Sequence, residues 1–555
     1  MARKRRMKSN ANDIQNDMPI MPKSRATLVV LLLTLLCQSV RAQTPQDEWQ
    51  EPTFPLREVR AVWLATVKSL DWPKNKATGT YGIEVQKREL CSMLDQLQRA
   101  NINAVVLQTR VRGSVIYPSD IEPWDDCLTG QGDRDPGYDP LQFAIDECHR
   151  RGMELHAWVV SIPLGNVQKQ RGLGSRSITR RHPELCQKCG EEWFMQPAAE
   201  GTADYIAALC REIAERYDID GISLDYIRYP ESTYGYRDNC TAQQRRDNIT
   251  RIVRRVHQQV KAVKPWVKLS SSPIGKYASL PRQSAGGWNC YDAVYQDPQA
   301  WLREGIQDLL FPMMYFRGDQ FYPFLYDWQE HSYGHPIAPG LGIYLLDPRE
   351  GRWTLDEVRA QMHTARNIGI GGVIHYRAEF LLRNCKGIYD TVCREFCPHP
   401  ALMPRMTWTG DTLPPRAPRN LMRVGSFLMW DKVLEGGKEV TYNLYGSNTY
   451  PVDTERAENL LRTNLRDTQF LLEGKLAERR YVAVCAMDRF GNQSVALQEK
   501  SIQSRPDSKN AWNPQSRIGE SGKRMDDRSK LFKSSKWKRL KSASGKKDKK
   551  RRWPF

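Results

Sequence analysis

Beyond its first 42 residues, this 555-residue chain has no hydrophobic run long enough to span a bilayer. One apolar run, Leu28–Cys37, is too short for that task, follows two basic residues, and precedes small residues where a signal peptidase would cleave. These features predict a signal-peptide region over residues 1–42, with Met21 as an alternative start. The mature chain is therefore expected to be exported, to the periplasm, the cell envelope or the extracellular space, with no transmembrane segment.

The body of the chain also lacks net charge. The total is +19, yet residues 43–504 carry 57 Lys+Arg and 57 Asp+Glu. A nucleic-acid enzyme carries its positive charge around the working cleft, so this balance argues against a nucleic-acid partner. The excess lies in the first 42 residues and in a Ser/Lys/Arg-rich stretch that predicts a disordered basic tail over 504–555. Its expected partners are anionic envelope polymers; a solvated tail with no partner is the alternative.

Histidine is scarce, and no two histidines have the short spacing on one strand that a metal-dependent barrel hydrolase uses. His156 and His375 each stand alone on a predicted strand, so we expect no catalytic metal and no cofactor. Two close cysteine pairs, Cys186/Cys189 and Cys393/Cys397, permit disulfides or together a zinc site. Most of the other cysteines fall at helix-patterned positions typical of buried thiols.

From residue 57 onward, short apolar runs alternate with amphipathic helical patterns. Eight such runs and their helices predict an α/β fold, a (β/α)8 TIM barrel over residues 55–400. A doubly wound sheet is the alternative, but no phosphate-binding glycine turn follows the first run. The predicted strands are 59–67, 103–110, 154–161, 219–224, 267–273, 308–315, 337–345 and 371–377, and the predicted helices include 84–99, 140–151, 203–217 and 355–367.

Barrel chemistry sits at the C-terminal ends of the strands, and here those ends are rich in aromatic rings, arginine and carboxylates. Rings stack on the apolar faces of sugars, while guanidinium and carboxylate groups hydrogen-bond hydroxyls. The strand ends therefore predict a carbohydrate site. The predicted substrate-binding residues are Trp72, Arg110, Trp158, Arg228, Tyr229, Tyr315 and Arg377.

Six motifs in order resemble those of the glycosyl-hydrolase-like family 10 group, secreted bacterial barrel proteins, over roughly residues 55–395. The resemblance implies a glycoside hydrolase fold and a bacterial cell-wall glycan, such as that of peptidoglycan, or another polysaccharide as substrate. The motifs are Arg57-Glu-Val-Arg-Ala-Val-Trp63, Leu70-Asp-Trp-Pro73, Leu107-Gln-Thr-Arg110, Leu155-His-Ala-Trp158, Asp220-Gly-Ile-Ser-Leu-Asp-Tyr-Ile-Arg-Tyr-Pro230 and Asp297-Pro-Gln-Ala-Trp-Leu-Arg-Glu-Gly305.

Glycoside cleavage uses two carboxyl groups, one of which stays ionised while the other holds a proton. Asp225 closes the fourth predicted strand, where barrel glycosidases resembling this chain place theirs, and we expect it to be the ionised nucleophile or base at an open, ring-lined mouth. Arg228 or Arg110 would keep its pKa low. The alternative is a structural role, as a cap or as an ion-pair partner of Arg228.

The proton donor is harder to choose because several carboxyl groups lie just past strand ends. Glu379 and Asp71 rank first, followed by Asp292 and Asp319. Each of the two first choices also suits a hydroxyl ligand or a structural ion pair.

After a linker over 401–418, short strand-like runs predict a second, all-β domain. The runs 427–430, 440–445, 469–472 and 480–487 indicate a β-sandwich over 419–503 that resembles a fibronectin type III domain. The sequence thus predicts a secreted glycoside hydrolase. A non-catalytic glycan-binding barrel of the cell envelope is the alternative.

Overall fold

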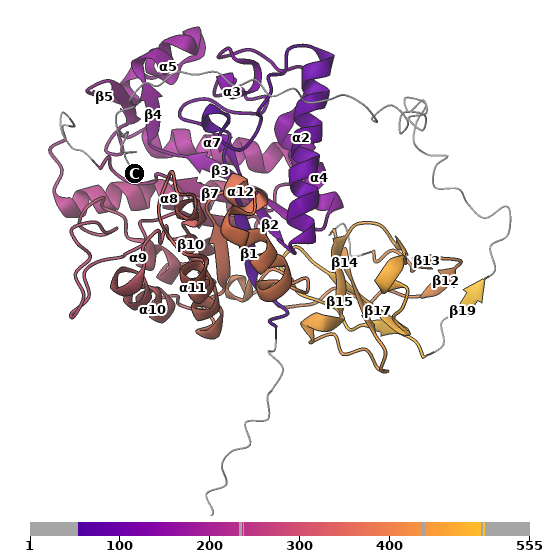
Figure 1. The fold of residues 1–555 in the computed structure, drawn as a ribbon. Helices are drawn as coiled ribbons and strands as arrows, with labels where there is room; N and C mark the ends of the chain where they lie inside the picture. The colour runs from indigo at the N-terminus through magenta and orange to yellow at the C-terminus, as the bar shows by residue number, and fades with distance from the viewer. Residues whose placement is uncertain (1–53, 232–235, 237, 435–438, 501–502, 506–555) are drawn as a thin grey trace, which may run out of the picture.

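The computed structural model describes residues 54–231, 236, 238–434, 439–500 and 503–505. The predicted signal-peptide region and nearly all of the predicted basic tail lie outside these residues. Eight parallel strands form one sheet in the order β10-β11-β1-β2-β3-β7-β8-β9 (Figure 1). They are β1 (Val59–Leu64), β2 (Ala104–Arg110), β3 (Glu154–Val160), β7 (Gly221–Asp225), β8 (Lys268–Ser271), β9 (Leu309–Leu310), β10 (Gly340–Leu341) and β11 (Gly372–His375).

The sheet closes on itself. Strand β11 pairs with β1, and bridges Leu310↔Ile337 and Met313↔Gly340 join the segments of β9 and β10. These last two strands are shorter than predicted because Pro312 and Pro339 lack the N–H that a continuous ladder needs. The predicted (β/α)8 barrel fold is confirmed.

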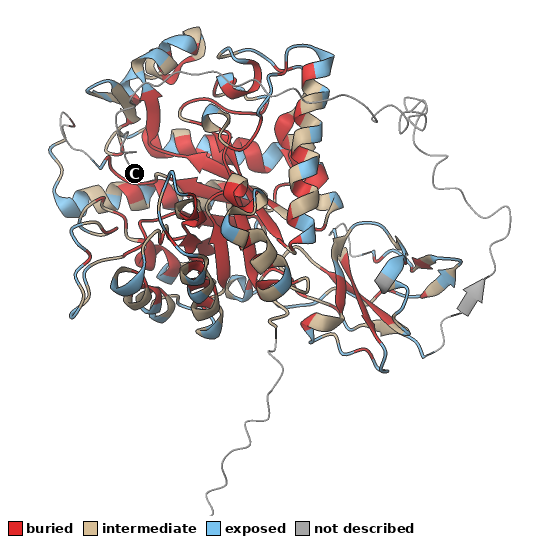
Figure 2. Ribbon diagram, in the orientation of Figure 1, coloured by how far each residue is buried: buried red, intermediate tan, exposed pale blue. Residues whose placement is uncertain are grey.

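Helices surround the barrel, with their buried faces turned to the strands and their outer faces exposed (Figure 2). Helix α8 shows why they form: Thr241 and Gln244 make a capping box at its start, and its apolar positions repeat at helical spacing. The helices are α2 (Thr80–Arg99), α3 (Asp126–Thr129), α4 (Pro140–Arg150), α7 (Thr202–Arg216), α8 (Ala242–Val263), α9 (Pro298–Arg303), α10 (Tyr322–Glu330), α11 (Leu355–Asn367), α12 (Ala378–Leu382) and α13 (Ile388–Thr391).

A long excursion leaves the barrel after β3 and returns at α7. It contains a three-stranded antiparallel sheet in the order β4-β6-β5 and two short helices. Because it starts at the C-terminal end of β3, it rises beside the mouth of the barrel. Its elements are β4 (Pro163–Asn166), α5 (Val167–Gly172), α6 (Ile178–Arg181), β5 (Cys186–Cys189) and β6 (Glu192–Met195).

The C-terminal part forms two four-stranded sheets, β16-β13-β12-β19 and β15-β14-β17-β18, around a core that includes Trp430 and Tyr442. The predicted strands of this part are present; the fibronectin type III assignment stays a prediction. The strands are β12 (Met422–Val424), β13 (Phe427–Met429), β14 (Thr441–Ser447), β15 (Leu460–Leu465), β16 (Gln469–Leu471), β17 (Tyr481–Met487), β18 (Leu497–Gln498) and β19 (Gln503–Arg505).

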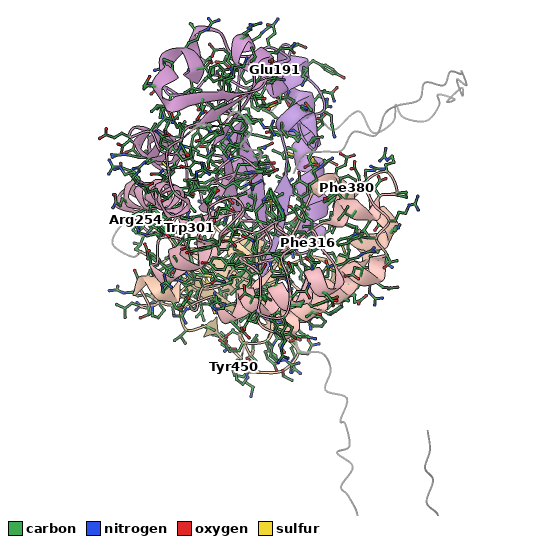
Figure 3. The ribbon with its side chains drawn as sticks, turned by 90° about the vertical axis from the view of Figure 1, so that its left-hand side faces the viewer. Glu191, Arg254, Trp301, Phe316, Phe380 and Tyr450 are labelled. Atoms are coloured by element: carbon green, nitrogen blue, oxygen red, sulfur yellow. The ribbon has the colours of Figure 1, made fainter. Side chains whose placement is uncertain are left out.

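This β-sandwich docks on the N-terminal ends of the barrel strands. Arg489 contacts Asp218 at 2.8 Å and Asp220 at 3.2 Å, just before β7. The side chains of Thr463 and Asn464 donate hydrogen bonds to the carbonyl of Gly152, before β3. The sandwich therefore lies at the end of the barrel opposite the mouth. Figure 3 shows the same separation, with Glu191 of the excursion and Tyr450 of the sandwich at opposite ends of the molecule.

The cysteine pairs do not form one site. Cys186 and Cys189 lie on β5 in the excursion, whereas Cys397 lies near Arg60 and Glu58, at the opposite end of the barrel. All cysteines in the described part of the chain are free. Among the same residues, none of the helices has both the length and the apolar character needed to cross a bilayer.

Candidate active site

Asp225 ends β7 at the mouth of the barrel and faces its interior. Register places it beside Val160 of β3, with Trp158 and Ser223 one layer below. Oδ2 accepts a hydrogen bond from the indole Nε1 of Trp158 at 2.9 Å, and Oδ1 accepts one from the backbone N–H of Tyr226 at 2.8 Å. Each oxygen has a further lone pair, so the carboxyl group can still bind a ligand.

Burial sets the protonation of this carboxyl group. Asp225 is only 4% exposed, and burial raises its pKa although Arg228 and the two hydrogen bonds favour the ionised form. The predicted low pKa is therefore wrong, and so is the expectation of an open mouth directly above the residue. A carboxyl group with a raised pKa suits a proton donor better than an ionised nucleophile.

Arg228 is packed beside Asp225. Its guanidinium lies 4.2 Å from the centre of the Tyr226 ring, and Nη2 donates to Glu231 at 2.6 Å. Nε and Nη1 are buried without a hydrogen-bond partner among the described residues. The side chain is thus near the predicted centre, but only part of its donor capacity is used.

Arg110 has a structural role instead of the predicted sugar contact. It is buried and forms a bidentate pair with Glu122, at 2.8 and 2.6 Å, and it donates to the carbonyls of Val160 and Ser161. These partners engage its guanidinium and join the end of β2 to the end of β3. It therefore cannot reach a glycan in this conformation, nor is it among the main influences on Asp225.

Asp71, Arg377 and Glu379 form a network that ties the loop after β1 to the loop after β11. Asp71 is buried and accepts hydrogen bonds from the N–H groups of Ala65 (2.7 Å) and Glu379 (3.0 Å) and from Arg377 Nη1. Burial raises the pKa of Asp71, with the Arg377 charge opposing it. Three internal donors engage its oxygens and one of them is a guanidinium, so Asp71 holds loops together and does not suit the predicted role of acid. Arg377 is likewise occupied.

Glu379 differs from Asp71 because its side chain is 27% exposed. Arg377, Arg383 and Lys74 lie 3.1, 3.3 and 3.5 Å from its oxygens. Burial opposes its ionisation, but Arg377 and Lys74 outweigh this and lower its pKa. Glu379 is therefore held as a carboxylate, which contradicts a role as proton donor and suits an ionised partner.

Three predicted aromatic contacts belong to the core. Trp72 is 0% exposed and donates from Nε1 to the carbonyl of Gln86. Tyr229 is equally buried, with its hydroxyl accepting from Asn248. Trp158, nearly buried, orients Asp225. The packing of neighbouring elements covers these rings, so none of them offers a face to a sugar.

Half-buried tyrosines at the mouth provide the aromatic lining. The predicted residue Tyr315 lies 5.3 Å from Tyr376 and 5.8 Å from Tyr344, measured between ring centres. Tyr226 follows Asp225 directly, with a left-handed φ of 50°. The charge of Asp225 contributes to the raised pKa values of Tyr226, Tyr315 and Tyr376, which shows that these rings are close to it. Prediction singled out only Tyr315; the signal for Tyr226 and Tyr376 was an aromatic residue immediately after a strand end.

A cleft of about 580 Å³ opens beside the mouth. We call it the rim cleft. Its walls come from residues 67–69 after β1, residues 111–112 after β2, residues 125–127, and parts of the excursion from Gly165 to Leu173. Arg112 connects the two regions, since it lines the rim cleft and its charge also acts on Asp225 and Tyr226.

The two histidines of the barrel strands are structural. His156 lies 3.0 Å from Glu154, and Nδ1 of His375 donates to the carbonyl of Ala61 at 3.2 Å. Burial lowers the pKa of His375 to about 4. Within the described ranges, no three His, Cys, Asp or Glu side chains gather as a metal site would require.

Comparison with known proteins finds a family model and relatives that match this chain. A model of the family described as Glycosyl hydrolase-like 10 matches residues 58–332. Glycosyl hydrolase YngK of Bacillus subtilis (strain 168) is 31% identical over 388 residues, covering 64% of this chain and 75% of the relative. Glycosyl hydrolase DigH of Escherichia coli (strain K12) is 31% identical over 330 residues, covering 53% and 75%. Among solved structures, the glycoside hydrolase domain of PgaB (BpsB) from Bordetella bronchiseptica aligns with a TM-score of 0.41 at 14% identity. The alignment covers 61% of this chain and 98% of the PgaB domain.

Proposed function

The chain belongs to the Glycosyl hydrolase-like 10 family, and from this we propose that it hydrolyses glycosidic bonds of a bacterial cell-wall glycan or another polysaccharide. The observation that carries the proposal is Asp225: a strand-end carboxyl group at the barrel mouth, oriented by Trp158, whose pKa is raised by burial. A group of this kind holds the proton that departure of a sugar requires.

In the proposed reaction, Asp225 donates its proton to the glycosidic oxygen as the bond from that oxygen to the anomeric carbon breaks. The electron pair of the bond leaves on the oxygen. Water adds to the anomeric carbon and transfers a proton to an ionised carboxylate, for which we propose Glu379 because Arg377 and Lys74 keep it ionised. The half-buried tyrosines and Arg112 border Asp225, so the glycan would approach past them.

Replacing Asp225 with Asn tests this proposal. Asn keeps the shape of the side chain but has no proton to donate at neutral pH. We expect release of soluble sugar from purified cell-wall glycan to fall by about 10²- to 10⁴-fold, while binding to the insoluble glycan is retained. Asp146→Asn, on the exposed face of α4, is the matched control and should keep full activity.

The slight exposure of Asp225 favours one alternative, a barrel that binds glycan without cleaving it. This alternative gains support if wild type and Asp225→Asn bind the same glycans and neither releases sugar. Glu379→Gln gives a second test of the hydrolase mechanism. It should lower the rate without weakening binding, and an unchanged rate would remove Glu379 from the mechanism.

We also propose that the protein is exported. Support comes from the apolar run Leu28–Cys37 with its basic flank. The basic tail would then contact anionic envelope polymers. Fractionation of cells expressing the full chain, with N-terminal sequencing of the mature protein, tests the export. An unprocessed protein in the cytoplasmic fraction would contradict it.

A further inference from the structure

We propose that the inner wall of the rim cleft is a subsite for a sugar carboxylate, with Arg112 and Lys68 as the cations that bind it. The inference rests on the proposed function in taking a glycan as the ligand, and it narrows the substrate to an acidic one. Both residues line the rim cleft, beside the mouth that contains Asp225.

Arg112 is free to take an anion. It is half-buried and follows β2 with a left-handed φ of 82°. Among the described residues its guanidinium has neither an ion pair nor a hydrogen-bond acceptor. Arg110, two residues earlier, shows the contrast, because Glu122 engages it fully. Holding a non-glycine residue in this backbone region costs free energy, and such positions cluster at ligand sites.

Lys68 is the second cation of this wall and, like Arg112, has a left-handed φ. It is exposed, has a φ of 51°, and has no carboxylate partner in the described ranges. Lys76, close by, donates to the hydroxyl of Ser69 at 3.0 Å and to the carbonyl of Cys127 at 2.8 Å. Those oxygens are neutral, so the positive charge of Lys76 also stays uncompensated there.

The acidic residues of the cleft offset part of this positive charge. Asp125 and Asp126 share Lys169 of the excursion, at 2.6 and 2.7 Å, and Asp125 also accepts from Ser114. With Glu192 on β6, the lining holds three carboxylates against four cations, Lys68, Lys76, Arg112 and Lys169. The excess positive charge lies on the side of the cleft formed by the ends of β1 and β2, where Arg112 and Lys68 have no carboxylate partner among the described residues.

Arg112 and Lys68 offer two different kinds of hydrogen-bond donor to a ligand in the rim cleft. A planar guanidinium and an ammonium group together suit a carboxylate, which accepts from both.

The subsite also fits the proposed chemistry. A carboxylate bound at Arg112 would place negative charge near Asp225 and favour its protonated form. A neutral glycan would leave the charge of Arg112 acting on Asp225 alone, which favours ionisation. An acidic substrate would therefore support the acid that cleaves it.

Binding to the Asp225→Asn variant tests the inference separately from turnover. The probes are oligosaccharides of bacterial cell-wall glycan with free carboxylates and the same oligosaccharides after chemical reduction of those carboxylates to alcohols. By calorimetry at low salt, we expect the acidic form to bind at least about tenfold more tightly. Adding Arg112→Gln or Lys68→Gln should remove most of the preference. Arg180→Gln, an exposed cation of α6 outside the cleft lining, should keep it.

Equal binding of the two forms, or an acidic preference that survives both substitutions, would overturn the subsite. Failure to bind either form would also count against it. The result is distinct from that of the hydrolase proposal: hydrolysis without an acidic preference removes only the subsite, and an acidic preference without hydrolysis removes only the catalytic proposal. Sulfated oligosaccharides form a third arm. Tighter binding of these than of the carboxylated oligosaccharides would overturn the assignment of a carboxylate subsite. Unchanged melting temperatures would show that the variants are folded.

Discussion

Arg489→Met should weaken the attachment of the sandwich to the barrel. Arg489 is mostly buried and bridges two carboxylates, Asp218 at 2.8 Å and Asp220 at 3.2 Å. Each hydrogen bond to a charged group contributes roughly 1.5–3 kcal/mol, which sets an upper limit of about 6 kcal/mol. The residual partners reduce this cost, because Asp218 keeps Arg466 and Asp220 keeps His149. Asp218 is also about one-third exposed, so water replaces part of its bond, and we expect a loss of about 2–3 kcal/mol.

Urea unfolding followed by circular dichroism measures this loss. Arg466→Met is the matched control, since it removes a cation that is 39% exposed and that, among the described residues, forms an ion pair with Asp218 alone. An exposed pair of this kind contributes up to about 1 kcal/mol. Arg489 does not anchor the sandwich if Arg489→Met lowers the free energy of unfolding no more than Arg466→Met does.

The pH dependence provides a second check on the same contact. Burial opposes the ionisation of Asp220, but His149 and Arg489 outweigh it and hold the pKa of Asp220 well below its ordinary value. A carboxyl group with a depressed pKa stabilises the folded state above its unfolded pKa, near 4, and this contribution is lost as pH falls. The stability difference between wild type and Arg489→Met should therefore shrink as the pH is lowered from neutrality to below about 4.

Three further predictions concern the barrel. Trp158→Phe removes a hydrogen bond that favours ionised Asp225, so the pKa of Asp225 should rise. The alkaline limb of the pH profile of kcat/KM should then move to higher pH. A limb that stays in place would contradict the role of Asp225 as proton donor. Gly221→Ala would bring a Cβ to 2.4 Å from His156 Nδ1, and thermal unfolding should show a loss of about 1–3 kcal/mol from overpacking. Arg110→Met leaves its buried glutamate partner without its cation and should cost about 3–5 kcal/mol by urea unfolding; a loss below 1 kcal/mol would show that the pair is not structural.

Much of the barrel could be predicted because each element carries its own periodic pattern. The buried face of α8, from Ile249 to Val260, repeats at helical spacing, and the strands are short apolar runs. Strand ends could be located for the same reason, and this brought attention to Asp225. The shortness of β9 and β10 was less visible. Pro312 follows β9 and Pro339 precedes β10, but the period of a strand does not report which N–H groups its neighbours require.

The roles of individual strand-end residues could not be predicted in the same way. Arg110 and Arg112 are the same residue type two positions apart, yet one is locked by Glu122 and the other lines an open cleft. Their difference depends on a partner twelve residues along the chain and on the excursion that follows β3. Side-chain exposure is a property of packing between distant segments, so one strand's sequence does not contain it.

Local patterns and motifs were enough to establish the family, the alternation of strands and helices, and the position of a carboxyl group at the end of β7. Other properties could be read only from the folded chain: Asp225 is buried with a raised pKa, Asp71 and Trp72 are internal, and Glu379 is held as a carboxylate. Protonation and access depend on the sum of burial, charges and hydrogen bonds around an atom. Those surroundings come from segments that meet only when the barrel closes.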